Sequence, residues 1–326
     1  MSSSRIGRQV VGIEPGVWDP PATYTAAAMP DPVESTFTLG GHRLAYTSYG
    51  EGPRVIVLVH GLLLSQRMHA VLAKALADRG NRAITIDLLG HGRSDRPPDM
   101  WRYSMTTFGA QVIALLDHVE VDEAVVLGTS LGANTALEAA ALAPERLRGM
   151  VIEMPVLDHA LLGCALAFTP LMVALTVGAP AMRLLSAVTR RISPLPWQAD
   201  ILLDTVRQRP EPSAAVLQGL FFGRTAPHRT ERRMLEMPAL VIGHQYDIVH
   251  PFSDSGMLVE ELPNGRLLQA NSILELRLAP ERLTNEIAEF VDECWRPRPA
   301  KRGGAARVSG AGTRSASRPR PSPPRP

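Results

Sequence analysis

The stretch Glu123-Ala124-Val125-Val126-Leu127-Gly128-Thr129-Ser130-Leu131-Gly132 decides the fold. Residues 123–127 are an apolar, β-branched run that predicts a buried strand, and residues 131–143 have the pattern of a helix. Between them, Gly-x-Ser-x-Gly places a serine among small residues at a sharp strand-to-helix turn, which would project Ser130 at the carboxyl edge of a sheet. An ordinary turn with a capping serine is the alternative interpretation.

The same alternation of short apolar runs and longer helical patterns continues on both sides of this stretch. Continuous apolar strands separated by helices are typical of a parallel sheet covered on both faces. Before them, two short strand patterns flank Gly40-Gly41, which indicates a hairpin. We therefore predict an α/β fold with a doubly wound, mostly parallel sheet and an antiparallel lead-in. Its strands are expected at 36–39, 43–48, 55–59, 82–86, 123–127, 149–153, 239–242 and 266–268, and its helices at 66–79, 106–118, 131–143 and 280–295.

The region between the two halves of the sheet has no strand pattern. Its apolar pieces at 161–177, 181–191, 198–207 and 213–222 are separated by Pro and Gly and have a helical pattern. We predict a helical cap over 156–233, inserted into a core formed by 34–155 and 234–295, with an N-terminal extension at 1–33. Residues 296–326 are rich in Arg, Pro, Ser and Gly, which predicts a disordered basic tail.

Charge is distributed unevenly along the 326 residues. The tail holds nine basic and no acidic residues, which leaves 25 basic against 32 acidic residues in 1–295, a net charge of −7. This acidic body argues against nucleic-acid binding by the folded part. The two cysteines are too few for a disulfide framework, and no signal-peptide pattern is present, so a cytoplasmic location is expected. Residues 160–182 carry no charge, but Pro170 and Pro180 interrupt them, and we expect no stable membrane span.

Three further loops follow predicted strands. His60-Gly61-Leu62 comes first, and its glycine would let the Leu62 amide form an oxyanion hole with the Leu131 amide above Ser130. His60 itself is interpreted as a structural residue of this turn. A Gly-rich loop occupies 87–94, and the segment 243–251 places the carboxylate of Asp247 at the same sheet edge as Ser130.

These motifs, in this order, resemble the α/β-hydrolase superfamily over residues 35–295, with the cap in the usual place. The resemblance implies a Ser130 nucleophile, an orienting acid at Asp247, and a histidine base after the last strand. The sequence departs from this pattern, because none of its nine histidines follows His250 and the expected position reads Asn271-Ser272-Ile273-Leu274-Glu275.

Three hypotheses account for the departure. In the first, another histidine acts as base: His250, three residues after Asp247, is preferred, followed by His159 beside Asp158, and then His91. In the second, Ser130 works with a carboxylate (Asp247, Glu275 or Asp158) or with a group on the substrate. In the third, the scaffold binds a ligand without covalent chemistry.

The predicted cap is far richer in apolar than in charged side chains, which favours a small apolar substrate. We therefore expect a serine hydrolase acting on an apolar ester or related acyl compound, with Gly61, Asp158 and His159 at the substrate. No metal-ligand spacing or phosphate-binding glycine motif is present, and no cofactor is expected. The alternatives are a non-catalytic binding protein and lyase or cofactor-free oxidation chemistry on the same fold. The sequence gives no indication of the oligomeric state.

Overall fold

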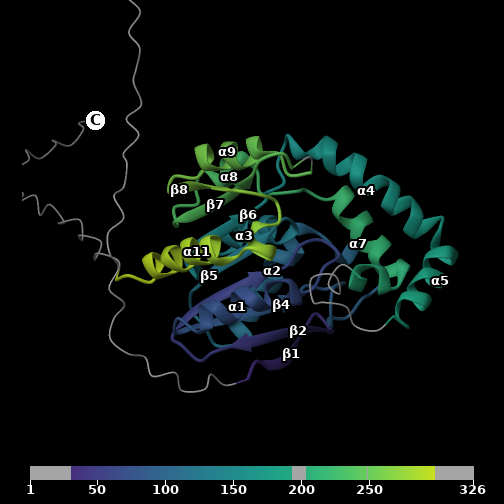
Figure 1. Ribbon diagram of the computed structural model, residues 1–326, viewed down its shortest axis with the longest axis horizontal. Coiled ribbons are helices and arrows are strands. Elements are labelled where there is room, and N and C mark those ends of the chain that lie inside the picture. Colours follow the sequence, from purple (N-terminus) through teal and green to yellow (C-terminus); the bar gives the residue numbers. More distant parts are fainter. Residues whose placement is uncertain (1–30, 193–202, 248, 298–326) are drawn as a thin grey trace, which may run out of the picture. The chain divides into compact units, whose positions relative to one another are not determined.

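An eight-stranded sheet forms the centre of the protein (Figure 1). The computed structural model describes residues 31–192, 203–247 and 249–297. The spatial order of the strands is β1-β2-β4-β3-β5-β6-β7-β8. Every pairing from β4 to β8 is parallel, whereas β1 and β2 pair with each other, and β2 with β4, in antiparallel fashion. The predicted doubly wound, mostly parallel sheet is therefore confirmed. The strands are β1 Val33–Leu39, β2 His42–Tyr49, β3 Arg54–Val59, β4 Asn81–Asp87, β5 Ala124–Thr129, β6 Leu147–Glu153, β7 Ala239–His244 and β8 Gly265–Ala270.

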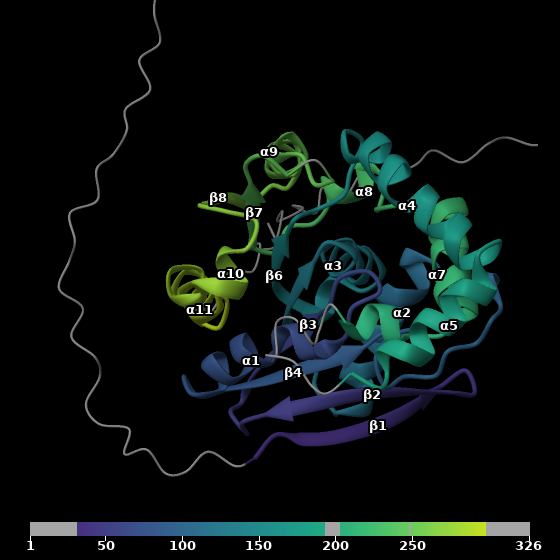
Figure 2. The same cartoon turned by 45° about the vertical axis from the view of Figure 1, so that its right-hand side comes forward.

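Helices cover both faces of the sheet (Figure 2). Because alternate residues of a strand point to opposite faces, Val57 and Val59 pack with helices α2 (Met105–His118) and α3 (Leu131–Leu142). Ile56 and Leu58 pack on the other face with α1 (Ala70–Ala77) and α11 (Glu281–Cys294). The central strands are apolar at successive positions because neither face meets water.

The remaining elements connect these layers. The lead-in hairpin turns at Gly40 and Gly41, whose φ angles of 56° and 81° lie in the region that glycine adopts without strain. Helices α4, α5 and α7 are inserted between β6 and β7 and gather at one end of the sheet (Figures 1 and 2). The bounds of the other helices are η1 Gln66–His69, η2 Met100–Arg102, η3 Pro144–Arg146, α4 Ala160–Thr176, α5 Ala179–Thr189, α7 Pro210–Phe222, α8 Arg229–Arg232, α9 Phe252–Glu261 and α10 Glu275–Leu278.

The sequence expectations differ from the structure at a few places. Helix α9 was not predicted, because its apolar residues are few and Gly256 interrupts them. The tail predicted to be disordered lies outside the described residues, apart from 296 and 297. The predicted extension up to residue 30 and the start of the predicted helical piece at 198–207 lie outside them as well. In the described part of the chain, no single helix is long and apolar enough to cross a membrane. Helices α4 and α5 meet that requirement only as a pair, and this pair is bent by 90°.

Candidate active site

Ser130 lies at the switch point of the sheet, where the chain places β5 on the opposite side of β3 from β4. Its φ of 54° and ψ of −112° are strained for a residue with a side chain. The surrounding glycines make this turn possible: a Cβ on Gly128 would lie 1.9 Å from the carbonyl oxygen of Gly132, and one on Gly132 would lie 2.1 Å from that of Val59. Small residues at 128 and 132 are therefore a steric requirement of this turn.

His250 is the imidazole that meets Ser130. Its Nε2 lies 2.9 Å from Ser130 Oγ, and its Nδ1 lies 2.9 Å from Asp247 Oδ2. The second oxygen of Asp247 accepts the backbone amides of Val249 and His250, each at 2.9 Å. The structure thus brings together the three residues predicted for a serine–histidine–aspartate arrangement, with the acid and the histidine on one loop after β7.

The protonation pattern of this arrangement follows from its hydrogen bonds. Burial alone would raise the pKa of Asp247, but the hydrogen bonds from the side chain and backbone of His250 outweigh it and lower the pKa. An ionised carboxylate only accepts, so Nδ1 of His250 carries a proton, and in the neutral imidazole Nε2 is left to accept from the Ser130 hydroxyl. This is the tautomer that a general base requires.

The loop after β3 lies against the same turn. Leu131 is the first residue of α3, so its amide has no intrahelical acceptor, and Leu62 and Leu131 both line the cavity that contains Ser130. A Cβ on Gly61 would lie 4.0 Å from Ser130 Cβ, in ordinary contact. The prediction placed the tight turn at Gly61, but the left-handed residue of this loop is Leu63, with a φ of 56°.

The other histidine candidates have different surroundings. His60 is fully buried: its Nε2 accepts the Leu88 amide at 3.1 Å, and its Nδ1 lies 2.8 Å from the Gly61 carbonyl. His91 is also fully buried, with its ring centroid 4.7 Å from that of His60. Burial lowers the pKa of both imidazoles, which therefore stay neutral. Neither has a solvent-facing nitrogen with which to act as a base.

His159 and the two alternative carboxylates also have other contacts. His159 is on the surface, with its Nδ1 3.0 Å from Asp254, and its neighbour Asp158 is exposed. Glu275 forms an ion pair with Arg282 at 2.8 Å. None of these three has a hydrogen bond to Ser130 in the described part of the chain.

A buried ionic network that sequence reasoning missed supports the turn from behind. Glu153, at the end of β6, accepts the Ser130 amide at 2.8 Å through its carbonyl, and its carboxylate accepts from Thr129 and from Arg277 of α10, the latter at 2.9 Å. Burial would raise the pKa of Glu153, but Arg277 and His244 together lower it strongly.

His244, the last residue of β7, completes the network at 3.5 Å from Glu153, longer than a hydrogen bond. Burial would lower its pKa, but the Glu153 carboxylate and the Ser272 carbonyl raise it. Part of the sequence signal was present, since Glu153 ends a predicted strand and His244 follows another by two residues, but Arg277 lies in a region without a recognisable pattern.

A second missed residue joins α4 to the loop that carries His250. The carboxylate of Asp254, in the first turn of α9, is fully buried. It accepts the backbone amides of Leu157 at 2.7 Å and of His159 and Ala160 at 3.0 Å each, and so caps the start of α4. Because α9 was not predicted, nothing in the sequence marked this residue.

Ser130 opens into an apolar cavity of about 340 Å³. Its walls come from the β3 loop, α3, α4 and α7, including Leu161, Phe168 and Leu217. Asn134 also lines it, but its side chain bonds Val156 and Thr225 and so has a structural role. Cys164 is the second nucleophile in the lining; burial raises the pKa of this thiol to about 11, so it stays protonated at neutral pH.

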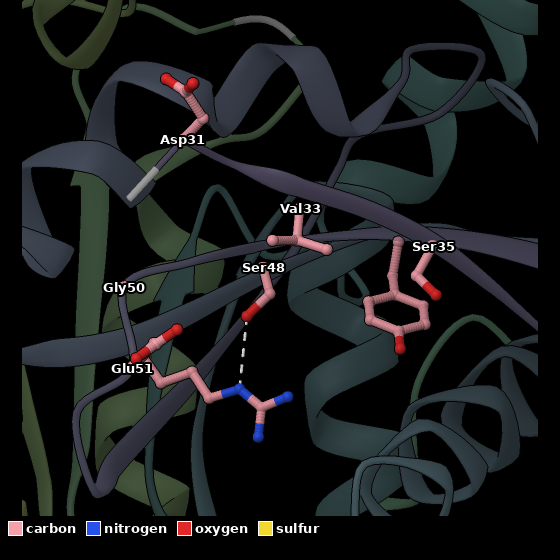
Figure 3. Close-up of a pocket in the computed structure, with 8 residues that line it drawn as sticks. Asp31, Val33, Ser35, Ser48, Gly50 and Glu51 are labelled. Carbon is pink, nitrogen blue, oxygen red and sulfur yellow. Dashed lines mark hydrogen bonds between the residues drawn. The ribbon is translucent and has the colours of Figure 1, made fainter. Parts of the chain in front are cut away.

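A separate cavity of about 350 Å³ lies beside β1 and β2 (Figure 3). Arg82 donates to Ser48 across it at 3.3 Å, and Asp31 and Glu51 add carboxylates to its edge. Its lining contains no histidine or cysteine and no residue of the Ser130 cavity. Among the described residues, no group of three or more His, Cys, Asp or Glu side chains could hold a metal ion.

Comparison with known proteins shows what part of this chain they resemble. Residues 54–169 match the sequence model described as the alpha/beta hydrolase fold. An epoxide hydrolase from Caballeronia sordidicola is 32% identical over 117 residues, 36% of this chain and 35% of that protein. A haloalkane dehalogenase from Mycolicibacterium paratuberculosis is 30% identical over 112 residues, 34% of this chain and 37% of that protein. The chain thus matches little more than a third of the length of these curated relatives.

Solved structures extend the likeness beyond the matched segment. The enol-lactonase from Burkholderia xenovorans has a TM-score of 0.64 and 22% identity, and covers 79% of this chain and 100% of its own. An epoxide hydrolase from Vigna radiata has a TM-score of 0.65 and 18% identity, and covers 80% of this chain and 98% of its own. At these identities the likeness concerns the fold. The resemblance to the α/β-hydrolase superfamily is therefore confirmed, by sequence over residues 54–169 and by the fold of the sheet with its covering helices.

Proposed function

We propose that this protein is a serine hydrolase that cleaves apolar esters or related acyl compounds. One observation carries the proposal: the relay from Ser130 Oγ through His250 to Asp247, with both distances at 2.9 Å, at an apolar cavity. The names of the relatives, epoxide hydrolase and haloalkane dehalogenase, and of the structural neighbour, enol-lactonase, support hydrolytic chemistry.

Catalysis would begin with attack of Ser130 Oγ on the acyl carbon. His250 Nε2 takes the hydroxyl proton, and the ionised Asp247 stabilises the imidazolium that forms. The carbonyl oxygen becomes an oxyanion, which the Leu62 and Leu131 amides would stabilise. Collapse of the tetrahedral intermediate expels the alcohol, which receives the proton from His250 and leaves Ser130 acylated.

Water completes the cycle. His250 removes a proton from a water molecule as it attacks the acyl carbon, and returns that proton to Ser130 when the acid product leaves. The same imidazole thus serves as base and as acid in each half. The apolar walls of the cavity favour a substrate whose acyl or alcohol portion is a hydrocarbon, because burying it removes apolar surface from water.

The test is labelling of the full-length protein with a fluorophosphonate probe, followed by hydrolysis of p-nitrophenyl esters of increasing acyl length. We expect labelling that Ser130→Ala abolishes, and a loss of kcat of at least about 10³-fold in His250→Asn. His159→Asn is the matched control and should retain activity, since His159 contacts Asp254 rather than Ser130. Unchanged turnover in His250→Asn would remove this residue from the mechanism.

The non-catalytic hypothesis was based on the missing histidine after the last strand. The position of His250 at Ser130 supports catalysis instead, and absence of both labelling and turnover in the native protein would restore the binding hypothesis.

A further inference from the structure

A third cavity, of about 920 Å³, is lined by residues of β1, β2 and η1, by the loop after β4, and by Arg190, Asp204 and residues 207–209. It shares no lining residue with the Ser130 cavity, but both border the loop after β3, which contributes Leu62 to one and Ser65 to the other. Its lining is strongly basic. The basic side chains are Arg67, Arg93, Arg96, Arg190, Arg207 and Arg209.

This basic lining contrasts with the rest of the molecule. Three acidic residues, Glu34, Asp87 and Asp204, face the six arginines in the described lining, an excess of three positive charges. Residues 1–295 as a whole carry a net charge of −7. A concentration of one sign of charge in a cavity focuses the electrostatic potential and attracts ligands of the opposite sign.

The acids do not neutralise every arginine. Asp204 pairs with both Arg67, at 2.5 Å, and Arg207, at 3.2 Å, while Glu34 pairs with Arg93. In the described part of the chain, no acidic side chain lies within 4.0 Å of the guanidinium groups of the other three arginines, which are Arg96, Arg190 and Arg209.

Arg96 is the most constrained of these three. Its Nη1 donates to Gln208 Oε1 at 2.8 Å and its Nη2 to the Gly92 carbonyl at 2.7 Å, so both partners are neutral. Burial lowers the pKa of Arg96, and the Asp87 carboxylate opposes this effect only in part. The positive charge of Arg96 is therefore incompletely compensated. Two of its five N–H groups are used, and the fork is held in a fixed orientation.

We propose that this cavity binds a phosphate group, with Arg96 as its fixed anchor and the exposed Arg190 and Arg209 as further partners. A planar guanidinium donates two parallel hydrogen bonds to a phosphate, and several guanidiniums together match its multiple charge. The cavity exceeds the size of one phosphate, so the group belongs to a larger organic molecule or to a chain of phosphates.

The site is connected to the proposed catalytic loop. Gln208, which accepts from Arg96, donates its own Nε2 to the Leu63 carbonyl at 2.8 Å, and Thr205 donates to the same oxygen at 3.1 Å. Leu63 is the strained residue beside Leu62. A phosphate bound to Arg96 is therefore linked through Gln208 to the support of this loop. The link to the catalytic loop rests on the proposed function, whereas phosphate binding to the cavity does not.

Binding is measured by isothermal titration calorimetry on the full chain at constant ionic strength, with inorganic phosphate and pyrophosphate as probes. Acetate is the third ligand and tests whether a carboxylate anion binds to the cavity as a phosphate does. We expect saturable binding, tighter for pyrophosphate, that weakens at least about 10-fold in Arg96→Gln. Arg102→Gln is the matched control, because Arg102 pairs with Asp99 at the surface and does not line the cavity. The basic tail is common to all variants, so it does not affect the comparison.

Arg190→Gln is the second test of the site and can be measured even if Arg96→Gln fails to fold. Arg190 is exposed, and Arg190→Gln should weaken pyrophosphate binding several-fold without unfolding the protein. Equal affinity in the wild type and both cavity variants, or no saturable binding, would overturn the site. Ser130→Ala should bind phosphate like the wild type, so failure of hydrolysis and failure of phosphate binding are distinguishable.

Discussion

Replacing Asp254 with alanine is expected to destabilise the protein strongly, because three buried amides at the start of α4 lose their acceptor. These are the N–H groups of Leu157, His159 and Ala160, at 2.7 to 3.0 Å from a carboxylate with no exposed surface. A hydrogen bond to a charged group contributes about 1.5–3 kcal/mol. Loss of three such bonds therefore lowers the free energy of unfolding by at least about 4 kcal/mol, which corresponds to a Tm lower by about 8–16 °C.

The assay is thermal unfolding followed by circular dichroism, with Asp158→Ala as the matched control. Asp158 lies in the same loop, but it is exposed and should leave the Tm within about 1 °C of the wild type. Asp254→Asn retains one carbonyl oxygen and should give an intermediate Tm. If Asp254→Ala melts within about 2 °C of Asp158→Ala, the capping carboxylate does not hold α4 in place and the reasoning is refuted.

The network behind Ser130 and the turn itself give three further predictions. Glu153→Gln leaves Arg277 without its buried partner and should lower the free energy of unfolding by about 3–5 kcal/mol, measured by urea denaturation; a loss below about 1 kcal/mol would contradict the assigned role. Because the pKa of His244 is raised in the folded state, its contribution to stability is complete below its ordinary value of 6.5 and is lost as the pH rises through the folded value. Urea midpoints should therefore fall with rising pH in the wild type more than in His244→Asn, and parallel curves would argue against the shift. Gly132→Ala places a Cβ 2.1 Å from the Val59 carbonyl and should cost about 1–3 kcal/mol and abolish fluorophosphonate labelling; normal labelling would show that the turn tolerates a side chain.

The sequence predicted the sheet well because its central strands are apolar at successive positions. The runs around Val57 and Val126 are short and rich in β-branched residues, which is typical of strands buried on both faces. The Ser130 turn was equally predictable, because a Cβ at residue 128 or 132 would lie about 2 Å from a backbone carbonyl oxygen, so that glycine is required at both positions.

The polar contacts that complete the site were less accessible to sequence reasoning. Which histidine meets Ser130 depends on how a loop after β7 folds back, and a spacing of three residues from Asp247 only suggested His250. Asp254 and Arg277 act across the fold, over separations of about one hundred residues or more, and no local pattern marks such pairs. Leu63 adopts a left-handed backbone that its side chain disfavours, so only the tertiary structure identifies it as the turning residue.

The placement of Asp247 and His250 on one turn has a consequence for engineering this chain. The backbone amides of Val249 and His250 hold the same carboxylate that orients the imidazole, so the pair keeps its internal alignment independently of how the last strand docks. Strand β8 and helix α11 contribute no hydrogen bond to this pair within the described residues. Substitutions that loosen the docking of β8 or α11 should therefore leave the proton relay intact, as long as Arg277 of α10 keeps its contact with Glu153.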